Sequence, residues 1–294
     1  MNTNDFRKYI NTKRVLVSDG ATGSNLQARG LDKGKAAEVW VLENPQAIRQ
    51  LHADFLQAGS DILLTCSFGA NRFRLDHAGL ADKIQEVNSR AVQIAREAIG
   101  DRSTLVAGSI GPLGQMLKPL GLLDSADAQQ AYAEQARALS EAGADILVIE
   151  TQFDIEEAKA AIQGVQSVCD LALVCSFSYD RGVKTMMGIS PTKMATELEE
   201  FDLAALGINC GKSLTDNLAC LQELKKATDA PIWFKPNAGL PSVDEMGDAV
   251  YATTPSDMAI LVPEWMVSGA VIIGGCCGTS PQHLAAIAAQ VAVQ

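Results

Sequence analysis

The chain has 294 residues, a length that suits one large domain or two small ones. Its formal net charge of −11 disfavours nucleic acid and anionic membrane surfaces as partners, because both repel an acidic protein. The sequence has no apolar run of about 18 residues, which excludes a predicted membrane-spanning helix.

The N-terminal stretch MNTNDFRKYINTKR lacks the apolar segment of a signal peptide. We therefore expect a cytoplasmic protein whose seven cysteines are reduced. In such a compartment cysteines act as buried packing residues, nucleophiles or metal ligands, and they do not form a disulfide framework.

Short apolar segments alternate with helical patterns along the chain. The predicted strands span residues 14–20, 61–66, 104–111, 145–151, 171–178, 203–210, 231–237 and 270–277. Helical periodicity fills the intervals, for instance over 82–100 and 127–143. Most of the strands are apolar throughout, which is typical of a parallel sheet covered on both faces. The pattern predicts an α/β protein with one domain, a (β/α)8 TIM barrel over residues 1–294, and a doubly wound open sheet is the alternative.

Polar residues follow these strands directly. In a TIM barrel the active site lies at the C-terminal ends of the strands, so these residues are candidates for it. In chain order they are Asp19-Gly20, Thr65-Cys66-Ser67, Ser109-Ile110-Gly111, Glu150-Thr151, Ser176-Phe177-Ser178, Asn209-Cys210, Lys235-Pro236-Asn237 and Gly275-Cys276-Cys277.

Three cysteines at these strand ends are candidates for one metal site. Cys210 ends the sixth predicted strand, and the vicinal pair Cys276 and Cys277 ends the eighth, within VIIGGCCGTS. Strands two apart lie roughly 10 Å from each other, so side chains that lean inward can reach one ion. Three thiolates with one open position are an arrangement that catalytic zinc can adopt. A redox pair at Cys276 and Cys277 is the alternative.

The other cysteines and the histidines have simpler interpretations. Cysteine is small and apolar, and three of the cysteines are predicted packing residues: Cys169, Cys175 and Cys220. Cys66, beside Ser67, is left open between packing and the site. The histidines are predicted surface or packing residues: His52, His77 and His283. A histidine general base and a zinc–histidine hydrolase are therefore not expected.

A zinc ion with three thiolate ligands favours one kind of chemistry. The anionic ligands make it a poor acid for producing hydroxide. The ion is better suited to holding a further thiolate at neutral pH. We therefore expect a substrate thiol to take the open position, lose its proton and attack an electrophilic carbon.

The sequence resembles the homocysteine S-methyltransferase family over almost its whole length. The matching stretches are DGATGSNLQARGL (19–31), AGSDILLTCSFGANRFRL (58–75), GSIGP (108–112), AGADILVIET (142–151), GINC (207–210) and GGCCGTSPQH (274–283). The pairing of GINC with GGCCGT is the most specific part. ANRFRL, TMMGISP and PNAGLP are more similar to the homocysteine-binding domain of cobalamin-dependent methionine synthase than to betaine–homocysteine methyltransferase.

The resemblance implies a (β/α)8 barrel in which Cys210, Cys276 and Cys277 bind zinc. Homocysteine would enter through its sulfur as the fourth ligand and leave as methionine. Asp19 and Glu150 match the family's carboxylates that hold the amino-acid end. Alternatively, Asp19 caps a turn, and Glu150 pairs with a nearby lysine or arginine.

Two asparagines are further predicted substrate-binding residues, Asn209 and Asn237. An asparagine oxygen could fill the open position of the metal before substrate arrives, and Asn237 is the candidate. The alternative for Asn237 is that it shapes the turn before Ala238-Gly239.

The methyl donor is expected to be methylcobalamin on a separate corrinoid protein, because the sequence reaches Gln294 without a cobalamin module. A small donor such as S-methylmethionine or a betaine is the alternative. Alternatives to this function are a demethylation pathway with a different thiol acceptor, and a zinc-binding subunit or sensor.

A corrinoid is large and needs an open rim of the barrel to reach the site. Apolar residues of the loop 111–125 could form a docking surface for it, or they could pack on the barrel and close the pocket. These are Met116, Leu117, Leu120, Leu122 and Leu123.

Overall fold

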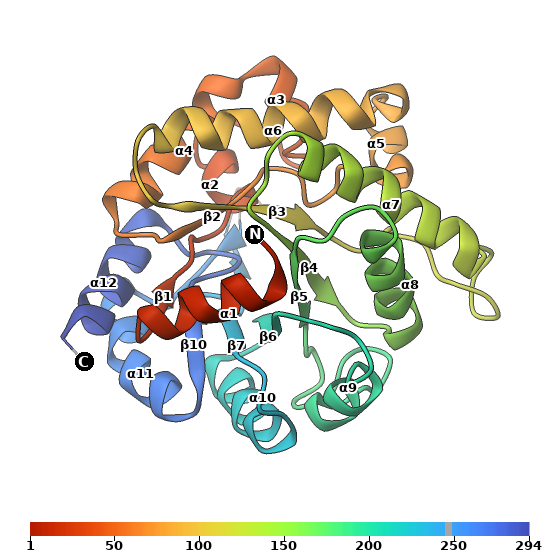
Figure 1. The fold of residues 1–294 in the computed structure, drawn as a ribbon. Coiled ribbons are helices and arrows are strands. Elements are labelled where there is room, and N and C mark those ends of the chain that lie inside the picture. Colours follow the sequence, from red (N-terminus) through yellow and green to blue (C-terminus); the bar gives the residue numbers. More distant parts are fainter. Residues whose placement is uncertain (245–248, 294) are drawn as a thin grey trace.

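The computed structural model describes residues 1–244 and 249–293 of the chain. Its main sheet has eight parallel strands in the order β1-β10-β7-β6-β5-β4-β3-β2. They are β1 (Leu16–Val17), β2 (Ile62–Leu64), β3 (Leu105–Ile110), β4 (Ile146–Gln152), β5 (Ala172–Phe177), β6 (Ala205–Cys210), β7 (Ile232–Pro236) and β10 (Ala270–Ile273). A parallel bridge between Ser18 and Ile62 joins the two edges of the sheet. The sheet is therefore closed, and the predicted (β/α)8 barrel is confirmed over the open sheet (Figure 1).

Helices surround the barrel, as Figure 1 shows. They are α2 (Gly23–Gln27), α3 (Val39–Glu43), α4 (Pro45–Gln57), α5 (Arg72–His77), α6 (Ile84–Ile99), α7 (Ser125–Glu141), α8 (Ile155–Gln166), α9 (Pro191–Glu197), α10 (Leu214–Ala227), α11 (Pro255–Val267) and α12 (Pro281–Ala292), with a 3-10 turn, η1, at Ala81–Lys83. Within the described ranges, no helix is both long and apolar enough to cross a membrane.

The strands are buried on both faces, as their uniform apolarity predicts. One core lies between the sheet and the outer helices, and a second fills the barrel interior. The interior core includes Leu16, Ile62 and Trp233. It continues into Phe6 and Ile10 of α1 (Thr3–Thr12), which covers the N-terminal end of the barrel. With that end closed by apolar packing, the polar residues gather at the C-terminal ends of the strands.

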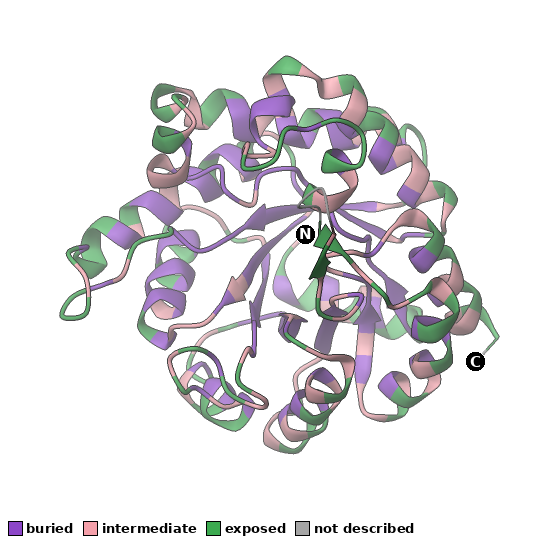
Figure 2. Cartoon of the chain, turned by 180° about the vertical axis from the view of Figure 1, so that it is seen from behind, coloured by how far each residue is buried: buried purple, intermediate pink, exposed green. Residues whose placement is uncertain are grey.

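A small hairpin is added to the barrel after β7. Its antiparallel strands are β8 (Ser242–Val243) and β9 (Ala249–Val250), and all four of these residues are exposed. Figure 2 views the barrel from the side opposite α1, with this exposed hairpin in front of it. The sequence pattern did not predict the hairpin, because strands of two residues carry no measurable alternation.

Candidate metal and substrate site

Three sulfur atoms meet at the C-terminal end of the barrel. Sγ of Cys210 lies 2.9 Å from Sγ of Cys276 and 3.9 Å from Sγ of Cys277. Thiolates bound tetrahedrally to zinc at about 2.3 Å would be about 3.8 Å apart, and the two distances bracket that value. Within the described part of the chain, this is the one group of three or more His, Cys, Asp or Glu side chains spaced to hold a metal ion. The donor set and its spacing therefore fit zinc.

The backbone around Cys210 has an unusual conformation. Cys210 ends β6 with a φ of 57°, in the left-handed region that non-glycine residues rarely adopt. Its carbonyl accepts a hydrogen bond from Nδ2 of Asn217 on α10 at 2.7 Å. Gly211 follows with a φ of 80°, and a Cβ there would lie 2.2 Å from Oδ1 of Asn217. Only glycine permits this approach, so the GINC-G turn places the first sulfur.

The vicinal cysteines are placed by backbone hydrogen bonds to two neighbouring strand ends. The N–H of Gly275 donates to the carbonyl of Asp19 at 3.0 Å, and that of Cys276 donates to the carbonyl of Pro236 at 2.9 Å. Oγ1 of Thr279 donates to the carbonyl of Cys276 at 2.7 Å. The turn after β10 is thus tied to the ends of β1 and β7, which aims both sulfurs toward Cys210.

The thiol of Cys210 forms hydrogen bonds with the other two. Hydrogen bonds from Cys210 and Cys276 lower the pKa of the Cys277 thiol. Hydrogen bonds to the other two sulfurs, together with burial, raise the pKa of Cys210. The cluster thus favours one thiolate over three, since further negative charge is costly in a buried group. A cation at the centre would remove this cost, which is the electrostatic requirement of a metal site.

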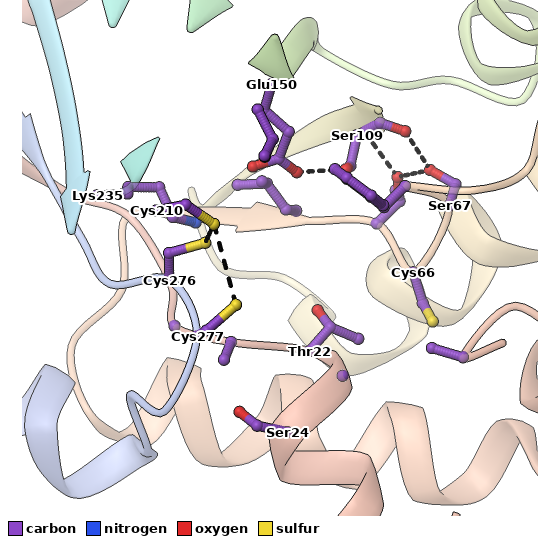
Figure 3. Close-up of a pocket in the computed structure, with 18 of the residues that line it drawn as sticks. Thr22, Ser24, Cys66, Ser67, Ser109, Glu150, Cys210, Lys235, Cys276 and Cys277 are labelled. Atoms are coloured by element: carbon purple, nitrogen blue, oxygen red, sulfur yellow. Dashed lines mark hydrogen bonds between the residues drawn. The ribbon is translucent and has the colours of Figure 1, made fainter. Parts of the chain in front are cut away.

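A cavity of about 430 Å³ opens beside the sulfurs (Figure 3). Its size suits a small amino-acid substrate. The cysteine cluster lies on one side of it, and Cys66 and Ser67 lie across from the cluster. Its polar lining residues include Thr22, Ser24, Thr65, Ser67, Glu38, Ser109, Glu150, Thr151 and Lys235.

Glu150 of β4 lines this cavity and is 7% exposed. Its Oε1 accepts a hydrogen bond from Oγ of Ser109 at 2.5 Å. Burial, only partly offset by the positive charge of Lys235, raises the pKa of Glu150 to about 7. An incoming ammonium group would favour the ionised carboxylate, as a substrate-binding residue requires.

Asp19 lies at the end of β1 and is only 1% exposed. Its Oδ2 accepts a hydrogen bond from the N–H of Leu64 at 2.7 Å, and its Oδ1 accepts one from Nζ of Lys235 at 2.6 Å. Burial alone would lower the pKa of Lys235, but the charges of Asp19 and Glu150 outweigh it and the pKa is raised. The structure thus gives Asp19 an ion-pair partner that lines the cavity, and a direct contact of Asp19 with substrate stays a prediction.

Asn209 is fully buried behind the sulfurs. Its Oδ1 accepts hydrogen bonds from the N–H of Thr151 at 2.9 Å and from Oγ of Ser176 at 2.6 Å. Its Nδ2 donates to Oγ1 of Thr151 at 2.7 Å and lies 3.9 Å from Sγ of Cys276. Thr151 has a φ of 63°, and these bonds hold that conformation next to Glu150. Asn209 therefore connects the carboxylate to the cysteines, and its predicted contact with substrate stays untested.

Asn237 follows β7 and is half-buried. Its Nδ2 donates to the carbonyl of Gly211 at 2.8 Å. Its Oδ1 is buried without a hydrogen-bond partner among the described residues. An oxygen in that state is suited to bind a metal ion, so the interpretation of Asn237 as a resting ligand stays a prediction.

The three cysteines predicted to be packing residues do not line the cavity. Cys175 and Cys220 are fully buried, and Cys169 is half-buried. Cys66 was left open, and it is buried in the cavity wall, where burial raises its pKa well above the usual value.

The three histidines lie away from the cavity lining. His52 is buried, His77 is exposed, and His283 bonds to Ser280 at the start of α12. These are positions of packing and surface residues, and the absence of a ligand role for the histidines stays a prediction.

The loop 111–125 is divided between packing and exposure. Leu117 and Leu123 are buried, whereas Leu120 is 67% and Leu122 is 90% exposed. Part of the loop therefore packs on the barrel, and docking of a partner at Leu120 and Leu122 stays a prediction. Figures 1 and 2 show the segment before α7 extending outward from the barrel.

The sequence did not reveal every residue of the site. Lys235 was noted only as a strand-end residue, and its pairing with Asp19 requires the barrel to bring β7 next to β10 and β1. Glu38 also lines the cavity, and its Oε1 accepts a hydrogen bond from the N–H of Gly69 at 2.6 Å. It precedes α3, outside every predicted strand end, so no sequence signal indicated it.

The fold and the cluster together define a class: a TIM barrel whose three clustered cysteines could hold a metal ion, beside a cavity of substrate size. Residues 16–291 match the family described as homocysteine S-methyltransferase, and the chain belongs to that family.

The curated relatives are longer proteins. The methionine synthase of Mycobacterium tuberculosis (strain ATCC 25618 / H37Rv) is 30% identical over 300 residues, which cover 96% of this chain and 25% of that protein. The methionine synthase of Mycobacterium leprae (strain TN) is 30% identical over 299 residues, which cover 95% of this chain and 24% of that protein. The chain thus spans about a quarter of the length of these relatives.

A solved structure superposes on this chain over nearly the whole length of both proteins. The homocysteine methyltransferase MmuM from Escherichia coli, in a metallated form, superposes with a TM-score of 0.83 at 27% identity. The match covers 97% of this chain and 99% of that one.

Proposed function

We propose that the chain is a zinc-dependent methyltransferase that transfers a methyl group to the thiol of homocysteine and forms methionine. The observation that carries the proposal is the group of three thiols within 4.8 Å of one another beside a cavity of about 430 Å³. Membership of the homocysteine S-methyltransferase family supports homocysteine as the acceptor. Reduced thiols require a reducing compartment, which supports the cytoplasm as the location.

Cys210, Cys276 and Cys277 would hold the zinc ion. When bound, zinc supplies positive charge that keeps a further thiol ionised at neutral pH. Asn209 and the backbone bonds of the turn after β10 keep the three sulfurs in place. Asn237, with its unpaired oxygen, is our candidate for a ligand before substrate binds.

Glu150 binds the ammonium group of homocysteine in this proposal, and the buried Lys235–Asp19 pair fixes the wall of the cavity beside it. Holding the amino-acid end there directs the substrate thiol toward the cysteine cluster. The substrate thiolate then attacks the methyl carbon in line. A sulfur–carbon bond forms as the bond from that carbon to the donor breaks, with its electron pair left on the donor.

We propose a methylcorrinoid on a separate protein as the donor. The similarity to two methionine synthases, which extend well beyond this domain, supports this choice. The exposed Leu120 and Leu122 offer apolar contacts for such a partner. A small diffusible donor is the second candidate, because the match to the E. coli homocysteine methyltransferase covers 99% of that chain.

One experiment in two arms tests the proposal. Metal content is measured by elemental analysis in the wild type and in Cys210→Ala. The zinc-loaded protein then receives homocysteine with either methylcobalamin or S-methylmethionine, and methionine is quantified. Zinc near one per chain, lost in the variant, with methionine formed from methylcobalamin, is the expected result.

The other outcomes separate the alternatives. Methionine from S-methylmethionine alone keeps the zinc chemistry and replaces the donor. Methylation of another thiol in preference to homocysteine favours a demethylation pathway. Absence of bound metal in the wild type, prepared under reducing conditions, contradicts the proposal and favours a redox pair.

A further inference from the structure

The wall of the cavity beside the cysteines contains a buried positive charge. Among the described residues that line the cavity, Lys235 is the one cation, and its ion-pair partner Asp19 is not a lining residue. Lys235 lies near the end of β7, and its side chain is only 2% exposed. A buried lysine is costly unless its ammonium group is paired or hydrogen-bonded. The barrel therefore keeps a cation at the wall of the candidate substrate cavity despite this cost.

The stem of Lys235 is fixed by its neighbours. Its Nζ lies 5.7 Å from the centre of the Trp233 ring, and that ring is fully buried in the barrel interior. A Cβ built on Gly274 would lie 3.2 Å from Cγ of Lys235 and 2.7 Å from the carbonyl oxygen of Asp19. The lysine stem thus follows a passage that a glycine leaves open. The ammonium group is therefore held at one place in the wall.

The ammonium group of Lys235 has an unused donor. It carries three N–H groups. One donates to Oδ1 of Asp19 at 2.6 Å, and Nζ also lies 3.4 Å from Oγ of Ser18. Nζ has no third partner within the described part of the chain. Asp19 differs, because its other oxygen already accepts a hydrogen bond from the N–H of Leu64 at 2.7 Å. A donor of Lys235 is thus available to a ligand in the cavity.

We infer that Lys235 binds the α-carboxylate of the substrate and makes this chain select thiols that carry that group. The inference rests on the proposed function, because it takes the cavity as the homocysteine site. Homocysteine carries its ammonium and carboxylate groups on one carbon atom, so a complementary cavity has opposite charges in its wall. Glu150 of β4 and Lys235 of β7 supply these charges, and Figure 3 shows both side chains at the same cavity.

The pairing with Asp19 positions the cation without using it up. A lysine ammonium group can bind two anions at once, because its donors point in different directions. Asp19 holds Lys235 from outside the cavity lining, and Oε1 of Glu150 accepts its hydrogen bond from Ser109. The substrate carboxylate then meets the lysine from the cavity side, while the substrate ammonium group meets Glu150.

Three thiols distinguish the two ends of the substrate. Homocysteine carries both charged groups, mercaptobutanoate lacks the ammonium group, and aminopropanethiol lacks the carboxylate. Their dissociation constants are measured by isothermal titration calorimetry with the full zinc-loaded chain. The proteins are the wild type, Lys235→Met and the double variant Asp19→Asn/Lys235→Met, which leaves no unpaired charge in the wall. Lys8→Met, on α1 with a side chain that is 78% exposed, is the matched control.

A selective loss of affinity is expected. Lys235→Met should weaken the binding of homocysteine and of mercaptobutanoate about thirtyfold, because a hydrogen bond between charged groups is lost. Aminopropanethiol should bind equally well or more tightly, since it has no carboxylate and a positive charge near its ammonium group is gone. The double variant should show the same selectivity, and it gives the result if Lys235→Met does not fold. Lys8→Met should match the wild type with all three thiols.

The other outcomes overturn the inference in distinguishable ways. Equal weakening of all three thiols would show that Lys235 only supports the cavity wall. Unchanged binding of mercaptobutanoate in both variants would assign the carboxylate to other groups of the cavity. If homocysteine does not bind to the wild type, the proposed function fails and this inference fails with it. If homocysteine binds and the variants show no selectivity for the carboxylate, only this inference fails.

Discussion

The two ends of the barrel are built in opposite ways. At the N-terminal end, α1 presents Phe6 and Ile10 to an apolar interior, and both side chains are buried. At the C-terminal end, Cys210 has a positive φ, and a charged pair between Lys235 and Asp19 is buried. Apolar packing at one end stabilises the barrel, which allows strain and buried charge to persist at the other.

The largest expected effect comes from removing a thiol at the C-terminal end. Cys210→Ala should abolish metal binding and lower the rate of methyl transfer by about a thousandfold or more. The variant keeps only two of the three thiolate ligands, which are too few to hold the ion. Elemental analysis and the rate of methionine formation measure both effects. Cys175→Ala, a buried thiol within β5, is the control and should keep its metal. Equal metal content in both variants would contradict the site.

A substitution at the N-terminal end of the barrel should lower the stability of the fold and leave metal binding unchanged. Phe6→Ala removes a fully buried ring and should lower the free energy of unfolding by about 3–5 kcal/mol. Urea denaturation gives this value, and metal content per folded chain should stay that of the wild type. A loss of metal from the folded variant would show that the two ends are coupled.

His52 on α4 links the fold to pH. It is 1% exposed, and neither ring nitrogen has a partner among the described residues. Burial lowers the pKa of His52 to about 4 from its usual value of 6.5. Because the unfolded chain takes up this proton first, stability is full above pH 6.5 and falls as the pH drops toward 4.

At pH 5 the buried neutral His52 should lower the free energy of unfolding by about 2 kcal/mol relative to neutral pH. Urea denaturation at pH 7.5 and pH 5 is compared between the wild type and His52→Leu, with His77→Leu at an exposed position as the control. The acid-induced loss should be smaller by that amount in His52→Leu alone. An unchanged loss would show that His52 is not buried in its neutral form.

A smaller effect is expected at the cavity wall. Glu150→Gln keeps an oxygen that can accept the hydrogen bond from Ser109 but removes the negative charge. KM for homocysteine should rise about tenfold, which corresponds to about 1.4 kcal/mol, while metal content stays unchanged. Asp154→Asn, which caps α8, is the control at another acidic position. No change in KM would exclude Glu150 from binding the ammonium group.

The smallest effect on stability is expected on the outward loop. Leu122→Asp alters a side chain that is 90% exposed and should change the free energy of unfolding by less than about 0.5 kcal/mol. If a corrinoid protein docks there, transfer from that protein should slow while transfer from free methylcobalamin does not. Equal rates from both donors would remove this loop from the docking surface.

Much of the fold could be predicted because the sequence is locally consistent. Each of the eight predicted strands overlaps an observed one, and only β4 extends past its predicted range, by one residue to Gln152. An uninterrupted apolar run between helical segments is rarely anything other than a buried strand. The hairpin β8–β9 could not be predicted, because its short strands are exposed and carry no pattern.

The sequence by itself determined the eight strands of the barrel, the residues at their ends and the three candidate metal-binding cysteines, through periodicity and spacing. Closure of the barrel decided which of these residues meet. It brought Lys235 to Asp19 and left Glu150 in the cavity wall. Such contacts join residues far apart in the chain, and only the register and closure of the strands determine their distances. The chemistry of the side chains is therefore local, whereas their charge state and accessibility depend on the tertiary structure.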